Sequence, residues 1–248
     1  EAIGLDAAGS LAMRGAAGAR EIDTLEFATL KIGETDAHGR LARLENGGWS
    51  IDVAGERVDL VPLLRGAQAA APQSQSNSAE ARVLPPLRIT ISPDAPLGEV
   101  LLAKGAQPIK RLAGTATYDG LRWDNALFDG RVGAGGIFFE IAESEGRRRL
   151  ILEAADAGAA IGLIGLTDGY ADGVLKVVGE FEDGEKDRPL VGRAAIAKLR
   201  VTAAPALAQI LTLASLTGIQ NTLSGRGIAF DSVVVPFRLT DDWVDIKE

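Results

Sequence analysis

The chain has no cysteine, and its only histidine is His38. The absence of cysteine excludes disulfide bonds, thiolate chemistry and cysteine-ligated metals. His38 lies in the turn-like sequence Asp36–Gly39 and has no nucleophile beside it, so we expect an exposed turn residue rather than a member of a catalytic triad. A zinc site needs several nitrogen or sulfur ligands and is not expected either.

Long hydrophobic runs are also missing. No segment approaches the roughly 18 consecutive apolar residues that a membrane-spanning helix needs, and no stretch has the basic start and apolar middle of a signal peptide. Because the sequence starts at Glu1 rather than at a methionine, we interpret the chain as a piece of a longer protein. Any membrane anchor is expected to lie outside this piece.

Positive charge is scarce. The formal net charge is -8, and the longest cationic run is Arg147–Arg149. Binding of nucleic acid requires a basic surface that neutralises phosphates, so no nucleic-acid partner is expected. We interpret the arginine run as the solvated start of a strand.

Carboxylates are abundant, but none stands in a recognisable catalytic motif. Asp241–Asp242, and Asp168 with Asp172, can be imagined as acid/base or calcium pairs, yet each lies in a polar or glycine-rich turn where solvation is the usual explanation. The run Gly133–Gly136 follows no P-loop lysine and precedes a strand instead of a helix, which argues against nucleotide binding. We therefore expect no enzymatic activity, no metal and no cofactor.

The composition favours a sheet protein. The 248 residues are 46% hydrophobic but only 5% aromatic, and 30 are glycine, which suits a multi-stranded sheet with many turns. The tryptophans Trp49, Trp123 and Trp243 stand in strand-like settings beside polar residues. Packing at a sheet margin is the common explanation, although tryptophan at such a boundary can also contact lipid headgroups or another protein.

Alternating apolar and polar residues predict a succession of strands. Asn46–Gly48 is a strong hairpin signal, and residues 59–64 can form one helical turn. The predicted organisation is an N-terminal β meander over 1–66, a linker over 67–86 that is rich in Ala, Ser, Gln and Pro, and a larger β region over 87–248. Strands are expected over 21–32, 39–44, 49–53, 87–91, 98–102, 112–118, 121–128, 130–141, 149–153, 173–181 and 190–201.

Two helices are expected in the larger region, one near 156–166 and one near 204–216. The second carries an apolar stripe at positions i, i+3, i+4 and i+7, which is the repeat of one helix face. This stripe consists of Leu207, Ile210, Leu211 and Ala214. Such a stripe must cover an apolar surface.

Period-two alternation also divides the late strands into an apolar face and a polar face. The polar face is expected to hold Lys176, Glu180, Lys198 and Arg200. The apolar face is expected to hold Leu175, Val177, Phe181, Ala195, Ala197, Leu199 and Val201. An ordinary core explains this pattern without any ligand, because an antiparallel sheet normally buries one apolar face.

Three segments give the chain a family resemblance. They are IGETDAHGRLARLENGGWSIDVAGERVDLVPLL, LILEAADAGAAIGLIGLTDGYADGVLKVVGEF and LTLASLTGIQNTLSGRGIAFDSV, and together they cover well over half of the chain. These segments resemble the C-terminal region of the AsmA-like, YhdP-type envelope proteins of Gram-negative bacteria, which belong to the bridge-like lipid transfer superfamily.

The resemblance implies a mainly β fold: a long twisted antiparallel sheet that forms an open curved groove, with a few short amphipathic helices. It implies a periplasmic segment that shelters phospholipid acyl chains during transport between the inner and outer membranes, anchored to the inner membrane through a part outside this chain. The lining expected from the resemblance and the alternation together comprises Leu175, Val177, Phe181, Leu199, Val201, Ile228 and Phe230, with Leu207, Ile210 and Leu211 as a lid or end plug.

A structural role is the alternative. The same sheet can act as a scaffold that assists outer-membrane biogenesis through contacts with outer-membrane or other envelope proteins. Enzymatic activity is a third and weaker option.

Overall fold

The structure is a computed structural model that describes residues 5–15, 20–69, 84–166, 169–185, 187–203, 215–220, 227–240 and 244–246. Most of these residues lie in strands, and the two helices of the described part are short. The expected class, a mainly β protein built from antiparallel strands with a few short helices, is confirmed. The chain divides into two compact units, residues 1–101 with 109–128, and residues 102–108 with 129–248.

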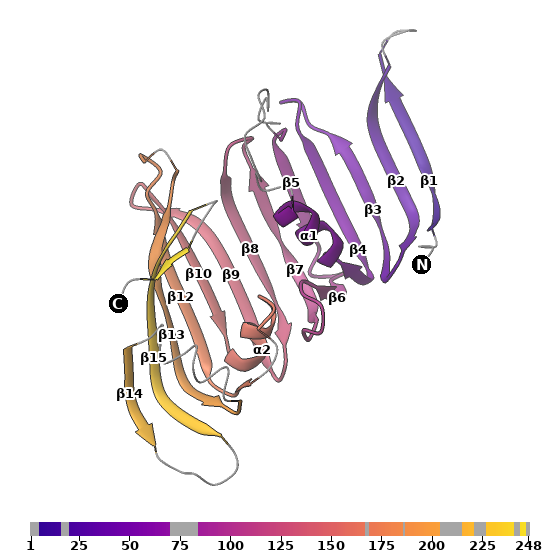
Figure 1. Cartoon of the computed structure of the whole chain (residues 1–248). Coiled ribbons are helices and arrows are strands. Elements are labelled where there is room, and N and C mark those ends of the chain that lie inside the picture. Colours follow the sequence, from indigo (N-terminus) through magenta and orange to yellow (C-terminus); the bar gives the residue numbers. More distant parts are fainter. Residues whose placement is uncertain are drawn as a thin grey trace. The chain divides into compact units, whose positions relative to one another are not determined.

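The first unit is a sheet whose strands follow the order β1-β2-β3-β4-β5-β7, with β6 paired to both β4 and β7. Neighbours are antiparallel, except that β4 runs parallel to β5 and β6. Figure 1 shows β1 to β4 side by side. The strands are β1 (Leu5–Arg14), β2 (Glu21–Ile32), β3 (Thr35–Arg43), β4 (Trp49–Asp59), β5 (Leu87–Ile91), β6 (Leu97–Leu101) and β7 (Ile109–Tyr118).

Local sequence explains the turns of this unit. Gly47 has a φ of +82°, a conformation that glycine adopts without strain, and the Asn46 side chain accepts a hydrogen bond from the Gly48 amide at 3.0 Å. The expected hairpin between β3 and β4 is therefore confirmed. His38 is exposed as expected, but it lies inside β3 rather than in a turn, because the turn falls at Gly33–Glu34.

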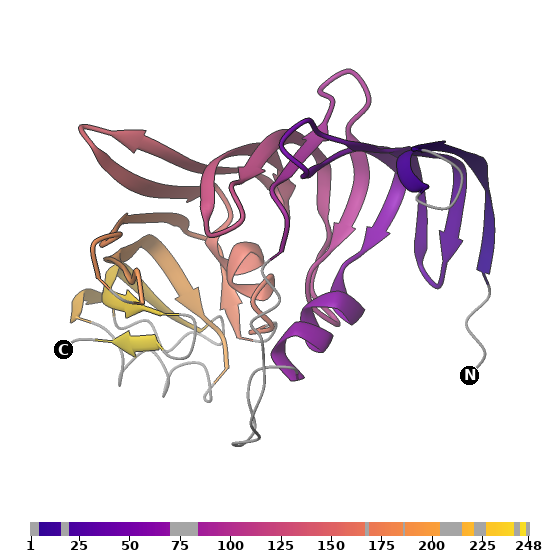
Figure 2. The same ribbon diagram turned by 90° about the horizontal axis from the view of Figure 1, so that it is seen from above.

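The buried core of the first unit lies around β6 and β7. Leu97 and Val100 of β6 are almost fully buried, as is Ile109 of β7. Helix α1 (Val61–Ala69) follows β4 and is capped by Asp59, whose carboxylate accepts a hydrogen bond from the Val61 amide at 2.9 Å. The helix stands to one side of the strands in Figure 2.

The second unit is a sheet with the order β9-β10-β12-β13-β15-β14. Strand β8 begins in the first unit and ends in the second, where it precedes β9. The long strands β13 and β15 curve along their length in Figure 1. The strands are β8 (Trp123–Val132), β9 (Gly135–Ser144), β10 (Arg147–Ala154), β11 (Tyr170–Ala171), β12 (Val174–Phe181), β13 (Leu190–Val201), β14 (Ser215–Gln220), β15 (Ile228–Leu239) and β16 (Val244–Ile246).

Helix α2 (Ala157–Gly162) packs against β11, β12 and β13 of the second unit. Asp156 is its N-cap and accepts hydrogen bonds from the amides of Ala159 and Ala134, each at 3.0 Å. The small side chain of Ala157 is fully buried, which lets the helix approach the strands closely. The expected helix near 156–166 is confirmed, although it is shorter.

Several expected boundaries differ in the structure. The expected strand over 130–141 is two strands, because Gly133 has a φ of +57° and turns the chain between β8 and β9. The helix expected near 204–216 falls largely on residues 204–214, outside the described residues, and 215–216 belong to strand β14 instead. Most of the expected linker over 67–86 also lies outside the described residues, and its first residues, 67–69, belong to helix α1 instead. Strand β4, which precedes helix α1, is paired with strand β5, which follows the expected linker, with Trp49 opposite Leu87. The boundaries between the two compact units fall at other positions in the sequence.

Candidate functional site

The strand register places apolar side chains of the second unit in rows that cross the sheet, since paired residues point to the same face. One row is buried and consists of Ile137, Ala154, Leu175, Ile196 and Val233. The next row on the same face is only half-buried and consists of Phe139, Leu152, Val177, Ala194 and Val235. This half-buried row is the part of the face that can still contact a ligand.

The expected lining residues fall into three groups. Leu175, Leu199, Val201 and Phe230 are buried, and Leu199 has an exposed fraction of 0%. Val177, Phe181 and Ile228 are half-buried. Leu207, Ile210 and Leu211 lie outside the described residues.

Strand pairing brings most of the described lining residues together. Leu199 lies opposite Phe230, and Val201 lies opposite Ile228. Leu175 belongs to the buried row, whereas an apolar hollow of about 470 Å³ that it also borders is lined by Phe138 and Val174, which the register places on the opposite face. Val174 is 54% exposed, so this hollow is open.

The opposite face of the second unit is mixed, with apolar residues such as Val174 and Val178 between paired charges. Lys176 contacts Glu153 at 2.6 Å, and Glu180 accepts hydrogen bonds from both Arg147 and Arg149 at 3.0 Å. The hydrogen bond from Arg147 is the main cause that holds the pKa of Glu180 below its usual range. The expected placement of Lys176 and Glu180 away from Leu175 is confirmed by the register.

The expected face of Ala195 and Ala197 is wrong. Ala195 lies opposite Lys176, and Ala197 lies opposite Val174, so both belong to the face away from Leu175. The reason is a kink at Lys198, whose φ of +57° is rare for a residue other than glycine. The strict alternation of the two faces is interrupted by one residue at this kink. Ile196 and Leu199 are therefore both buried, while the two residues between them are exposed.

A buried ion pair ends the apolar face of the second unit. Arg148 is only 5% exposed, its guanidinium contacts the carboxylate of Asp183 at 2.9 and 2.6 Å, and its Cζ lies 3.8 Å from the centre of the Phe181 ring. The expectation that residues 147–149 form a solvated strand start is therefore wrong for Arg148. Period-two alternation turns this residue to the apolar face, between its exposed neighbour Arg147 and half-buried Arg149.

The first unit has a more open apolar face. One row of paired residues consists of Leu25, Leu41, Ile51, Ile89 and Ala116. On the same face lie the paired residues Phe27, Gly39 and Val53 of β2 to β4, and the pair Ile91 and Gly114 of β5 and β7. Most of these side chains are half-buried, and Leu11 of β1, which lies opposite Leu25, is 53% exposed. In the described part of the chain, strands β1 to β5 make extensive contacts only with other strands of their own sheet.

Sequence reasoning identified most of these strands but did not assign their apolar face to the site. The signal that could have found it is the alternation in 25–27, 49–53 and 87–91. Each of these segments places an apolar residue at every second position.

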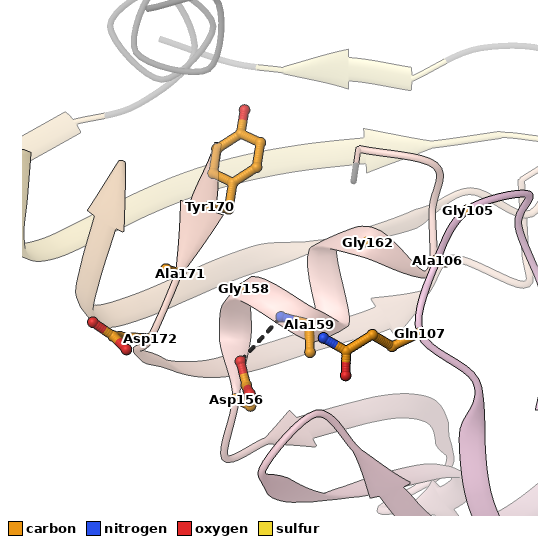
Figure 3. Close-up of a pocket in the computed structure, with 10 residues that line it drawn as sticks. All are labelled: Gly105, Ala106, Gln107, Asp156, Gly158, Ala159, Gly162, Tyr170, Ala171 and Asp172. Carbon is orange, nitrogen blue, oxygen red and sulfur yellow. Dashed lines mark hydrogen bonds between the residues drawn. The ribbon is translucent and has the colours of Figure 1, made fainter. Parts of the chain in front are cut away.

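A polar pocket of about 350 Å³ lies beside α2 in the second unit (Figure 3). The Gln107 side chain from the loop 102–108 lies at one side, and Tyr170 and Asp172 lie at the other. Burial raises the pKa of Tyr170. Asp156 is engaged in capping α2, and Asp172 binds Arg200 at 2.8 Å, so these carboxylates have structural partners.

Asp168 and Asp241–Asp242, the remaining candidate acids, lie outside the described residues. Within the described ranges, no group of three or more histidine or carboxylate side chains is arranged to hold a metal ion.

None of the helices in the described part combines the length and the apolar character needed to cross a bilayer. Comparison with known proteins adds no relative: no family model matches the chain, and neither the curated proteins nor the solved structures contain a significant match.

Proposed function

We propose that this chain shelters phospholipid acyl chains on the apolar faces of its sheets, as a periplasmic segment of an AsmA-like protein that carries lipid between the inner and outer membranes. The resemblance of its three segments to that family supports the setting. The acyl chains are held by apolar contact without any bond being made or broken, so the proposed function needs neither a catalytic group nor a cofactor.

The observation that carries the proposal is the half-buried state of whole rows of apolar side chains. A sheet face that served only as a core would be covered, as the row containing Leu175 is. Instead, Leu41 and Ile51 in the first unit, and Leu152 and Val177 in the second, keep part of their surface accessible. Contiguous accessible apolar surface of this kind marks a site of interaction.

Acyl chains gain enough from such a surface to explain binding. Moving a sixteen-carbon chain from water to an apolar surface buries about fifteen methylenes at roughly 0.8 kcal/mol each, or on the order of 12 kcal/mol. A groove that covers only part of the chain still offsets several kcal/mol of this. The headgroup can remain in solvent.

One observation favours the alternative, an assembly role through protein contacts. All ten residues of β1 are exposed, and β1 lies at the edge of the strand order of the first unit. An edge strand with free backbone groups can pair with a strand of another protein. Lipid binding and partner pairing therefore make different demands on the chain, and substitutions can separate them.

The test is a pair of matched aspartate substitutions in each unit. Leu41→Asp places a charge on the apolar face of β3, whereas Ala42→Asp, one residue on, places it on the opposite face. Val177→Asp and Val178→Asp form the same pair on β12, where both native side chains are half-buried. Leu199→Asp is unsuitable, because that side chain is fully buried and the substitution would unfold the protein.

Binding is measured by native mass spectrometry and by titration with a fluorescent phospholipid, with circular dichroism as the check of folding. We expect Leu41→Asp and Val177→Asp to weaken binding roughly ten-fold or more, and the two controls to bind as the native chain does. If the native chain takes up no phospholipid, the proposal is wrong. Equal binding by a folded apolar-face variant and its control would exclude that face as the lining.

A further inference from the structure

At one end of the apolar face of the first unit, a row of three aromatic side chains, one arginine and one leucine borders the aliphatic rows. Arg43 lies opposite Trp49, which lies opposite Leu87, which in turn lies opposite Tyr118. The rings of Tyr118 and Trp123 are 5.4 Å apart between centroids, so Trp123 extends the row. We call these five residues the rim.

The rim borders the aliphatic row directly. Arg43 and Trp49 each lie two residues along their strands from Leu41 and Ile51, a distance of about 7 Å. Tryptophan and tyrosine suit such a boundary, because each has an apolar body and a polar group that can remain in water. Charge and apolar surface therefore lie close together, which is the pattern that a phospholipid presents.

Arg43 is the one cation of the rim, and in the described part of the chain its guanidinium lies against an aromatic ring rather than a carboxylate. Its Cζ lies 5.0 Å from the centre of the Trp49 ring, and its Nε–H is buried and donates to no acceptor in the described part of the chain. Asp23, on the neighbouring strand β2, pairs with Arg14 at 3.7 Å. The buried Nε is out of reach of a ligand, but the two terminal nitrogens of this guanidinium are not among the buried unpartnered atoms and can donate to an acceptor that a ligand brings.

We infer that Arg43 binds the phosphate of a phospholipid whose acyl chains lie on the adjoining rows of Leu41 and Ile51. A guanidinium donates two parallel hydrogen bonds to a phosphate group, and the flanking rings fit the boundary between headgroup and acyl chains. This inference rests on the proposed function and adds to it a choice of ligand: lipids that carry a phosphate are preferred over lipids that lack one.

The test compares two lipids with identical acyl chains, phosphatidylglycerol and diacylglycerol, on the full 248-residue chain. The variants are Arg43→Gln and Arg43→Lys, and the matched control is Arg88→Gln. Arg88 is exposed, and it lies opposite Ser50, on the face away from the rim. Thermal unfolding by circular dichroism establishes that each variant is folded, and inorganic phosphate at millimolar concentration is titrated separately.

The native chain should bind phosphatidylglycerol roughly ten-fold or more tightly than diacylglycerol. Arg43→Gln should abolish this preference while leaving diacylglycerol binding unchanged, Arg43→Lys should keep only part of it, and Arg88→Gln should keep all of it. Inorganic phosphate should not compete.

Three results would overturn the inference. They are equal binding of both lipids by the native chain, a preference that survives Arg43→Gln, and binding of free phosphate as tight as that of the lipid. In the first two cases acyl binding still stands, so the proposed function survives. Failure of the native chain to bind either lipid would remove the proposed function, and this inference with it.

Discussion

Replacing Arg148 with alanine should destabilise the second unit far more than replacing its neighbour Arg147. Arg148 is 5% exposed and forms two hydrogen bonds to Asp183, and it also stacks over Phe181. Arg147 has a side chain that is 69% exposed and pairs with Glu180 at 3.0 Å. Both substitutions remove an arginine and one ion pair, and they differ chiefly in burial.

The expected magnitudes follow from that difference. Breaking a buried pair costs about 3 to 5 kcal/mol, because the remaining charge loses its partner, and the cation–π contact contributes to this cost. Asp183 has a side chain that is 24% exposed, so water can reach it and the cost should lie near the lower limit. An exposed pair such as that of Arg147 contributes about 0 to 1 kcal/mol.

Urea unfolding followed by circular dichroism measures both variants, and hydrogen exchange of peptides from β10 and β12 locates the effect. The comparison is valid if the slope of the unfolding free energy against urea is unchanged. Arg148→Met is a second variant that keeps most of the apolar volume, so it should cost less than Arg148→Ala. Equal costs for Arg148→Ala and Arg147→Ala would refute the argument that burial decides the contribution of these pairs.

Two further predictions concern the second unit. Because the folded-state pKa of Glu180 is lowered, its pairing stabilises the fold above the usual glutamate pKa and is lost as the pH falls through the lowered value. The urea midpoints of the native chain and Glu180→Gln should therefore converge between about pH 7 and about pH 3, and a constant difference would count against this pairing. A Cβ at Gly192 would clash with the Val178 carbonyl oxygen, so Gly192→Ala should cost about 1 to 3 kcal/mol in thermal unfolding. Gly162→Ala in α2 is the control, since no atom outside its chain neighbours and its own helix backbone lies within 4 Å of the new Cβ. It should be neutral or stabilising by up to about 1 kcal/mol. Equal melting of the two variants would contradict the close approach at Gly192.

Much of the fold could be predicted because local signals decide it. The hairpin at Asn46–Gly48 follows from glycine at a positive φ, and strand β13 has the bounds that alternation predicts. Strand β1 was missed because its sequence, LDAAGSLAMR, has small residues where bulky apolar ones would mark one face. The parallel pairing of β4 with β5 has no local signal, since it joins segments that are separated by a long connection.

The candidate site was harder to predict, because alternation tells which side chains share a face but not what covers them. Val177 and Leu199 look equivalent in the sequence, yet one is half-buried and the other is fully buried. The kink at Lys198 was also hidden, because lysine rarely has a positive φ and gives no warning of one. Alternation across that kink therefore assigned Ala195 and Ala197 to the wrong face.

Arg43 and Arg148 both stand where the alternation of the strand calls for an apolar residue, but their surroundings differ. A cation among apolar side chains needs a partner, and Arg148 finds one within the chain in Asp183, which closes that end of the face. Arg43 has the Trp49 ring for its charge, but its Nε has no acceptor among the described residues. A chain that needed Arg43 only for stability would gain by supplying such an acceptor, as it does for Arg148. The contrast agrees with a role of Arg148 in folding and with the proposed role of Arg43 in binding a phosphate.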